Sequence, residues 1–203
     1  QTHINKLEKA FKKDNVFGGV AHVSSNSTSP GVIQHVGKIK RLSFGNRFDS
    51  NIEFAKDFYE ICRKADFQTI LSDNINQDLW EKWIFIATIA GSTTLFQTSI
   101  NNISKNPEGK KFIQDLWEEC INISKENGFE LTAESKNLHD DLLFKSDVPF
   151  KASMLVDMEK KLMTEHEHIF LEFIKLGKKK KLNTKLLEVC YLNMSIYQAS
   201  LIS

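Results

Sequence analysis

The stretch that decides the fold is residues 77–96, which read Gln-Asp-Leu-Trp-Glu-Lys-Trp-Ile-Phe-Ile-Ala-Thr-Ile-Ala-Gly-Ser-Thr-Thr-Leu-Phe. From Trp83 to Ala90 this stretch is apolar except for one threonine. A helix is apolar on every side only when other elements surround it, so the stretch predicts a central helix. The protein is therefore expected to be mainly α-helical and built around this segment.

Other helices are predicted where apolar residues recur every three or four positions and where the ends carry helix-stop signals. Gly128 and Gly177 are interpreted as two such stops, since glycine readily takes the left-handed conformation that ends a helix. The helices are expected at residues 4–11, from Ser50 through Cys62, at 107–126, at 149–176 and at 184–199.

Residues 15–46 have a different character, with β-branched residues and five of the nine glycines. This composition predicts strands. They are expected at Val16–Ser24, Val32–Gly37 and Ile39–Phe44, with turns over Ser24–Gly31 and at Gly37. Three short strands cannot cover two faces of a sheet unaided, so their sheet partners are expected upstream of this chain.

The composition argues against several classes of function. The 27 basic and 26 acidic residues nearly balance, which argues against nucleic acid as the main partner. The longest apolar run is too short to cross a membrane, and no signal peptide opens the chain. Cys62, Cys120 and Cys190 form no Cys-x-x-Cys pair, which favours reduced thiols. These features predict a soluble cytoplasmic protein, and Gln1 at the start suggests a piece of a longer polypeptide.

Lys82 stands where the central helix passes from polar to apolar residues. Partial burial there would lower the pKa of its ammonium and make it a better proton donor near neutral pH. The alternative is an ordinary surface lysine that pairs with Asp78 one turn earlier. Spacing alone does not decide between them.

Glu165 occupies a position on the apolar stripe of the helix expected at residues 149–176. Its carboxylate could belong to a buried ion pair, could accept a hydrogen bond from a substrate, or could lie at the stripe edge near Lys161. Glu165 and His168 also have the Glu-x-x-His spacing of di-iron bundles. Since no second such pair occurs in the sequence, no metal site is expected.

The sequence holds neither a Gly-x-Gly-x-x-Gly nor a Gly-x-x-x-x-Gly-Lys, and so no fingerprint for a dinucleotide or a nucleoside triphosphate. No nucleophile elbow is visible either, although a Ser-His-Asp or Cys-His relay is not excluded by sequence.

Four sequence elements in combination match a known pattern. They are Phe17-Gly-Gly-Val-Ala-His with a later Pro30-Gly-Val-Ile-Gln-His-Val-Gly, Asp78-Leu-Trp-Glu-Lys-Trp, Ser153-Met-Leu-Val-Asp157, and Thr164-Glu-His-Glu with the later Asn183-Thr-Lys-Leu-Leu. On these elements the chain resembles the ketopantoate reductases, or 2-dehydropantoate 2-reductases, from about Ile4 to its end.

The resemblance implies a helical C-terminal domain of the 6-phosphogluconate dehydrogenase-like type, preceded by strands left over from a Rossmann sheet. Residues 1–48 would be the remnant of the nucleotide-binding domain, and residues 49–203 would be the helical substrate-binding domain. Most of the NADPH site would then lie upstream. The family also implies a small-molecule 2-keto acid as substrate. No membrane partner is expected from the composition, and a homodimer is a further candidate.

For the site residues, the resemblance implies that Lys82 is the general acid that protonates the ketone oxygen and that Glu165 binds the substrate hydroxyl. Ser153 and Asp157 are expected to bind substrate, with Ser153 at its carboxylate. This chain departs from the family at three positions where asparagines are usual, which hold Ile86, Ala90 and Phe150. Fewer amide side chains favour a more apolar 2-keto acid.

Two functions follow as hypotheses. The first is an NADPH-dependent reductase of ketopantoate or a related branched 2-keto acid, as in pantothenate biosynthesis, with this chain alone inactive. The second is a non-catalytic helical module that keeps the fold for dimerisation or ligand sensing.

Overall fold

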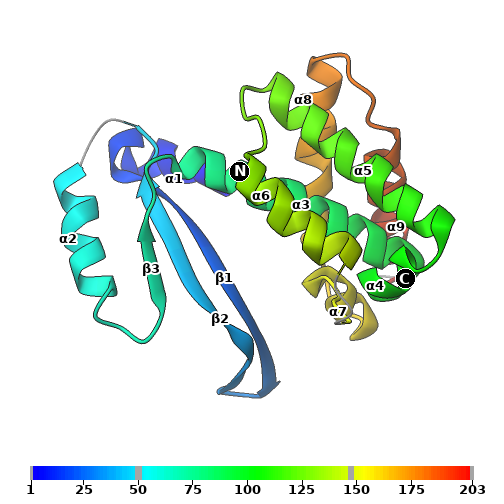
Figure 1. Ribbon diagram of the computed structural model, residues 1–203, viewed down its shortest axis with the longest axis horizontal. Coiled ribbons are helices and arrows are strands. Elements are labelled where there is room, and N and C mark those ends of the chain that lie inside the picture. Colours follow the sequence, from blue (N-terminus) through cyan, green and yellow to red (C-terminus); the bar gives the residue numbers. More distant parts are fainter. Residues whose placement is uncertain (1, 49–51, 146–148, 202–203) are drawn as a thin grey trace. The chain divides into compact units, whose positions relative to one another are not determined.

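The computed structural model describes residues 2–48, 52–145 and 149–201 (Figure 1). The chain forms two compact units, Thr2–Leu79 and Trp80–Ser203, so that the division falls within one helix, α3 (Ile75–Phe96). The start expected for a helix at Ser50 lies outside the described residues. The expected domain division beside residue 48, made on family grounds, stays a prediction.

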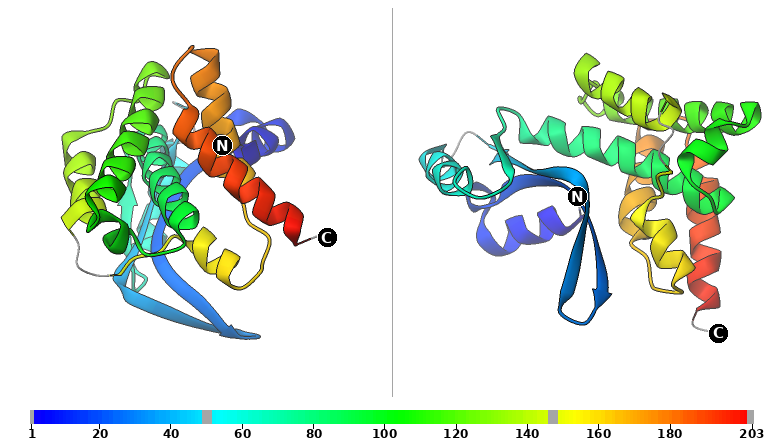
Figure 2. Two further views of the ribbon diagram at one scale, coloured as in Figure 1. Left: turned by 90° about the vertical axis from the view of Figure 1, so that its right-hand side faces the viewer. Right: turned by 60° about the horizontal axis from the view of Figure 1, so that its bottom comes forward.

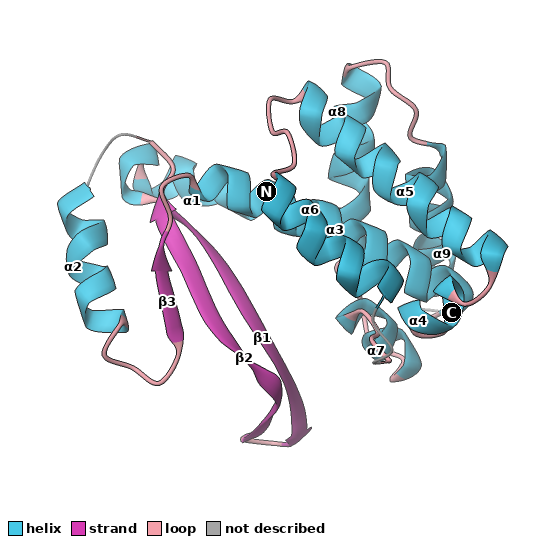
Figure 3. Cartoon of the chain, in the orientation of Figure 1, coloured by secondary structure: helices cyan, strands magenta, loops and turns pink. Residues whose placement is uncertain are grey.

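The first unit contains a three-stranded sheet in the order β1-β2-β3 (Figure 3). Its elements are α1 (Thr2–Phe11), the 3₁₀ turn η1 (Lys13–Asn15), β1 (Phe17–Ser29), β2 (Val32–Asn46), α2 (Ile52–Cys62) and β3 (Gln68–Leu71). β1 and β2 form an antiparallel hairpin that turns at Gly31, where φ is 79°. β2 pairs with β3 in parallel.

Two expectations for these strands are wrong. Gly37 does not end a strand, because β2 runs unbroken from Val32 to Asn46. The loop expected over Ser24–Gly31 is mostly strand, since β1 continues to Ser29 and pairs with β2 through two irregularities in register. The antiparallel pairing along the hairpin supplies hydrogen bonds to this polar segment, which its composition alone does not reveal.

β2, α2 and β3 form a βαβ unit, the building block of a Rossmann sheet. α2 packs on the sheet through aromatic contacts. The ring of Phe58 lies 4.8 Å from that of Phe44, and the ring of Phe54 lies 5.4 Å from that of Phe17. Strands in residues 15–46 are thus confirmed as part of a small mixed sheet, and the short apolar run before the central helix proves to be a strand of the same sheet. Their origin in a Rossmann domain stays a prediction.

The second unit consists mostly of helices that lie around α3 (Figure 2). It contains α4 (Ile100–Ser104), α5 (Pro107–Glu126), α6 (Ala133–Asp140), the π-helical turn η2 (Asp141–Lys145), α7 (Ser153–Glu159), the π-helical turn η3 (Glu167–Leu171), α8 (Glu172–Lys179) and α9 (Lys185–Ser200). The mainly α fold with its small sheet is therefore confirmed.

α3 is the central helix that the sequence predicts. Ile84, Ala87 and Thr88 on it are fully buried. The hydroxyl of Thr88 donates to the carbonyl of Ile84, and that of Thr93 to the carbonyl of Ile89, so these polar atoms are satisfied within the helix. The helix can therefore be covered on nearly all sides without leaving these hydroxyls unpaired.

The single helix expected over residues 149–176 is wrong. α7 ends at Glu159, and the chain then turns through Lys161, whose φ is 57°. The hydroxyl of Tyr197 on α9 donates to the carbonyls of Met158 and Leu162 at 3.3 and 2.9 Å. Because α9 supplies these hydrogen bonds, the turn keeps its backbone satisfied without helical continuation.

Gly177 is not a helix stop, since α8 continues to Lys179. A Cβ atom at residue 177 would lie 2.5 Å from Thr184 Cγ2 and 3.0 Å from Ile123 Cδ1. Gly91 on α3 shows the same close approach, where a Cβ would lie 2.8 Å from the Sγ of Cys190. These glycines allow helices to pack closely.

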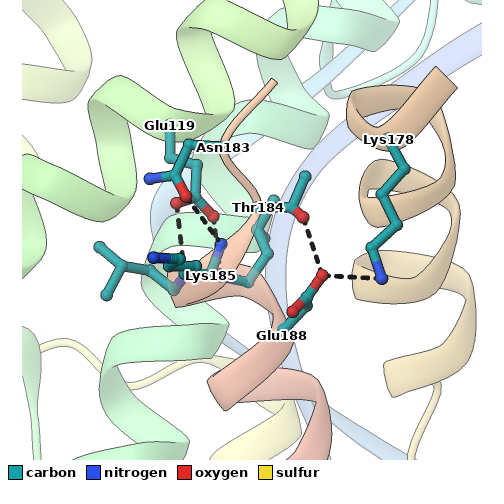
Figure 4. Close-up of polar contacts among 8 residues, drawn as sticks. Glu119, Lys178, Asn183, Thr184, Lys185 and Glu188 are labelled. Carbon is teal, nitrogen blue, oxygen red and sulfur yellow. Dashed lines mark hydrogen bonds and ion pairs between the residues drawn. The ribbon is translucent and has the colours of Figure 1, made fainter. Parts of the chain in front are cut away.

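The N-terminus of α9 is capped from another helix (Figure 4). Glu119 on α5 is buried, and its carboxylate accepts hydrogen bonds from the backbone N–H groups of Leu186 and Leu187 at 3.3 and 2.9 Å. Burial raises the pKa of this carboxyl, and the two hydrogen bonds oppose that effect. The first turn of α9 thus has its donors satisfied, and α9 is tied to α5.

None of the helices among the described residues is long and apolar enough to cross a membrane. All three cysteines are buried and unbridged, and burial raises the pKa of Cys190 to about 12.

Candidate active site

Lys82 is half-buried on α3, among the aromatic side chains at the start of the apolar segment. Trp83 next to it is 9% exposed and packs against Phe173 with ring centroids 4.1 Å apart. Burial lowers the pKa of the Lys82 ammonium, and the negative charge of Glu165 raises it in part. The helix pattern allowed either a partly buried or a surface lysine at position 82. Lys82 is half-buried, and Glu165 is the carboxylate whose charge raises its pKa.

Glu165 lies in the connection between α7 and η3, with its side chain exposed. Its own carbonyl accepts hydrogen bonds from the N–H groups of His168 and Ile169, at 3.0 and 3.3 Å, and so begins the next helical turn. The sequence identified Glu165 as a member of a continuous helical stripe, which is wrong. The residue instead stands at the start of a turn, where its side chain can face α3 while remaining accessible to solvent.

Three contacts hold this turn in place. The indole N–H of Trp83 donates to the carbonyl of Ile169 at 3.0 Å, which fixes η3 against α3 directly beside Lys82. Gln198 on α9 accepts a hydrogen bond from the N–H of Thr164 at 3.1 Å. His166 is buried, with its ring 5.6 Å from that of Tyr191. The residues on both sides of Glu165 are therefore anchored, which fixes its backbone relative to Lys82.

Ser153 and Asp157 both lie on α7. Ser153 is its first residue and is exposed, while Asp157 follows one turn later and is half-buried. The hydroxyl pKa of Tyr197 is raised by burial and by the charge of Asp157, which places Asp157 close to the turn before Glu165. Contact of Ser153 or Asp157 with a substrate stays a prediction.

The sequence did not identify an aromatic stack beside Lys82. Phe85 lies one turn after Lys82, and its ring stacks on that of His139 with centroids 4.6 Å apart and an interplanar angle of 16°. The ring of Phe85 also stacks on that of Phe150, with centroids 6.4 Å apart and an interplanar angle of 21°. Only the spacing of Phe85 from Lys82 is visible in the sequence, since the stack joins residues from three segments.

The three positions that depart from the family differ in their surroundings. Ile86 is half-buried one turn after Lys82, and Ala90, two turns after Lys82, is 1% exposed within the core. Phe150 is 40% exposed. Ala90 is thus a packing residue, whereas Ile86 and Phe150 are accessible in part.

The described residues contain no group of three or more His, Cys, Asp or Glu side chains placed to hold a metal ion. Within the described part of the βαβ unit, the glycine near the end of β2 offers no place for the pyrophosphate of a dinucleotide. This glycine, Gly45, is needed for packing, since a Cβ there would lie 2.6 Å from the carbonyl oxygen of Ser72. It is not available for close approach of a phosphate.

Residues 74–198 match the family model described as "Ketopantoate reductase PanE/ApbA C terminal". The chain belongs to the ketopantoate reductase family, a family of oxidoreductases.

Three similar proteins illustrate the match. The uncharacterized oxidoreductase YkpB of Bacillus subtilis strain 168 is 29% identical over 197 residues, which make up 97% of this chain and 65% of YkpB. A dimeric ketopantoate reductase from Staphylococcus aureus superposes with a TM-score of 0.78 at 19% identity, over 92% of this chain and 63% of that chain. D-mandelate dehydrogenase in a ternary structure with NADH and anilino(oxo)acetate gives a TM-score of 0.87 at 19% identity, over 99% of this chain and 66% of that chain.

The two structural likenesses establish the fold. This chain spans less than two thirds of the length of the curated relatives that it matches.

Proposed function

We propose that the protein reduces a branched 2-oxo acid, such as 2-dehydropantoate, to the 2-hydroxy acid, with NADPH as the reductant. The observation that carries this proposal is the half-buried Lys82 ammonium on the central helix, whose pKa burial lowers and the charge of Glu165 raises in part. A cation held in a partly dry site is suited to an oxygen atom on which negative charge develops. The family match supports the same chemistry.

In this mechanism Lys82 donates a proton to the ketone oxygen of the substrate. Its pKa is lowered by burial, which makes the ammonium a stronger acid than an exposed lysine. The carboxylate of Glu165 opposes this shift and keeps the lysine protonated over a wider pH range. Burial of Lys82 and the charge of Glu165 together therefore determine the pKa of the proton donor.

Substrate binding is assigned to Glu165, Ser153 and Asp157. Glu165 is exposed and accepts a hydrogen bond from a substrate hydroxyl, and Ser153, exposed at the start of α7, binds the substrate carboxylate. Asp157 is half-buried on α7, and its carbonyl accepts a hydrogen bond from the N–H of Leu162 at 2.9 Å. The backbone of Asp157 therefore also helps to position the turn before Glu165.

When bound, the nicotinamide cofactor supplies the hydride. Since these 203 residues contain no Gly-x-Gly-x-x-Gly and span 65% of the length of YkpB, we assign most of the cofactor site to a part of the full-length protein outside them. The 203-residue chain alone is then inactive. The NADH named in the D-mandelate dehydrogenase structure supports a nicotinamide cofactor, and the choice of NADPH rests on the family resemblance.

A second copy of the protein is proposed as a partner. Val189, Leu192 and Ile196 on α9 are 47%, 58% and 63% exposed and follow one another at intervals of three and four residues. This is the spacing with which two helices pack against each other. The dimeric state named for the S. aureus ketopantoate reductase supports the proposal.

A non-catalytic module is the second candidate, favoured by Ile86 and Phe150 at positions where asparagines are usual in the family. One experiment separates the two. The full-length protein is supplied with NADPH and a panel of 2-oxo acids, and the oxidation of NADPH is followed by absorbance. Reduction of at least one 2-oxo acid, lost in Lys82→Ala, supports the reductase. No oxidation with any member of the panel would contradict it and favour the module.

A further inference from the structure

Phe150 stands out because it is a large apolar side chain with 40% of its surface exposed next to the proposed substrate-binding helix α7. Its backbone is fixed, since its carbonyl accepts a hydrogen bond from the N–H of Ile100 at 2.9 Å. Its ring is nearly parallel to that of Phe85. Contacts of both the backbone and the ring of Phe150 therefore fix its position.

The stack continues into the core. Phe85 lies against His139, which is 7% exposed and meets Trp117 edge-on with ring centroids 5.5 Å apart. Burial lowers the pKa of His139 to about 4, so its ring is uncharged at neutral pH. Three nearly parallel rings therefore form a rigid, uncharged series that begins in the core and ends at the partly exposed Phe150.

This series lies on the same side of α3 as the proposed proton donor. Residues three and four positions apart share a helix face, so Phe85 and Ile86 flank Lys82 one turn further along. All three side chains are half-buried. A molecule whose ketone oxygen is at the Lys82 ammonium would have its adjacent groups near Phe85 and Ile86, and Phe150 extends this apolar surface through its stacking on Phe85.

We propose that Phe85, Ile86 and Phe150 form an apolar wall that selects 2-oxo acids with an aromatic or other large apolar side chain. This inference rests on the proposed reductase function and names its substrate class. An aromatic substituent can stack on rings held in this way. The hydroxyl of 2-dehydropantoate could donate to Glu165, but Ile86 and Phe150 offer it no further hydrogen bond, whereas an aromatic substituent needs none and gains apolar contact.

The test compares two substrates in the full-length protein with saturating NADPH. We expect kcat/KM for 2-oxo-2-phenylacetate to exceed that for 2-dehydropantoate by at least about 10-fold. The variant Phe150→Asn should reduce this ratio by about 10-fold or more, mainly through a higher KM for the aromatic substrate. Phe150→Leu keeps an apolar side chain and should retain most of the preference.

Phe96→Asn is the matched control. Phe96 also lies on α3, is 44% exposed and has an aromatic neighbour, Phe112, with ring centroids 5.0 Å apart. It lies more than three turns from Lys82, and its substitution should leave the substrate ratio unchanged.

A preference for 2-dehydropantoate, or a ratio that Phe150→Asn leaves unchanged, would overturn the wall while leaving the reductase function in place. Failure to reduce any 2-oxo acid would overturn the reductase function and the wall with it. If Phe150→Asn does not fold, the wild type and Phe150→Leu still decide. A wild type without the preference, or a Phe150→Leu variant that loses it, would overturn the apolar wall.

Discussion

The carboxylate of Glu165 raises the pKa of the Lys82 ammonium, in opposition to the burial that lowers it. The two residues come from a central helix and from a turn more than eighty positions further along the chain. The indole N–H of Trp83, the neighbour of Lys82, donates to the carbonyl of Ile169 and so ties the segment after Glu165 to the central helix.

Replacement of Lys82 by alanine should lower the turnover of the full-length protein by at least about 100-fold, because general acids contribute factors of this size. The affinity for NADPH should hardly change, since the cofactor is assigned to another part of the protein. Steady-state kinetics and a fluorescence titration with NADPH measure the two quantities. Lys110→Ala, at an exposed position of α5, is the control, and unchanged turnover in Lys82→Ala would remove Lys82 from the mechanism.

Replacement of Glu165 by glutamine should shift the pH profile. Lys82 donates only while protonated, so turnover falls as the pH rises through its pKa, which burial places below that of an exposed lysine. Without the Glu165 charge that pKa decreases further, and the decline should begin at lower pH. The KM for the 2-oxo acid should rise as well. Glu167→Gln, at the exposed neighbouring carboxylate, should leave the profile in place, and an equal shift there would argue against a specific pair.

Tyr197→Phe removes the hydroxyl that donates to the carbonyls of Met158 and Leu162. The loss should cost about 1 kcal/mol of unfolding free energy, the usual net value of a hydrogen bond. Since the turn before Glu165 loses its support, kcat/KM should decrease too. Urea denaturation and kinetics test the two effects, and a loss of stability with no change in kcat/KM would show that the turn does not depend on Tyr197 to hold Glu165.

His139→Phe should reduce the sensitivity of the fold to acid. Burial lowers the pKa of His139 from 6.5 to about 4, so the unfolded chain takes up a proton in that pH range before the folded one does. Stability is therefore lost as the pH falls from 6.5 towards 4, by about 3 kcal/mol at roughly 1.4 kcal/mol for each pKa unit. Phenylalanine preserves the stack without this titration. Denaturation curves of the wild type and of His139→Phe at pH 7 and pH 4.5 test this. An equal loss of unfolding free energy in the two proteins would contradict the prediction.

Leu192→Asp should convert a dimer into monomers, because it introduces a charge into the exposed apolar stripe of α9. Light scattering coupled to gel filtration gives the mass in solution. Leu138→Asp on α6 is the matched control, since Leu138 is similarly exposed, at 48% against 58%, but lies outside that stripe. A wild type that is monomeric at all concentrations tested would refute the proposed pairing.

Local signals predicted some elements closely. The helix expected at residues 107–126 has those bounds, because Asn106 caps its first N–H groups, Pro107 opens it and Gly128 takes a φ of 92° after its end. The central helix was also predicted, since its apolar surface on all sides needs no knowledge of its neighbours.

The errors occur where a distant residue decides the local structure. The break after α7 depends on hydrogen bonds from Tyr197, which lies 35 residues beyond Leu162 in the chain. The sequence pattern predicts Glu165 within a continuous helix, whereas the residue follows this break, and its charge acts on Lys82 from there. The stack of His139, Phe85 and Phe150 joins three separate segments, so no periodicity within one of them could reveal it.

The support that α9 gives to the turn before Glu165 has a consequence for biosynthesis. The ribosome releases Lys82 and Glu165 before it releases Tyr197 and Gln198, which hold that turn. A nascent polypeptide therefore contains both side chains for some time without the hydrogen bonds that α9 gives to the turn. Termination of synthesis within α9 would leave a protein that keeps the Trp83–Ile169 hydrogen bond but lacks this second support.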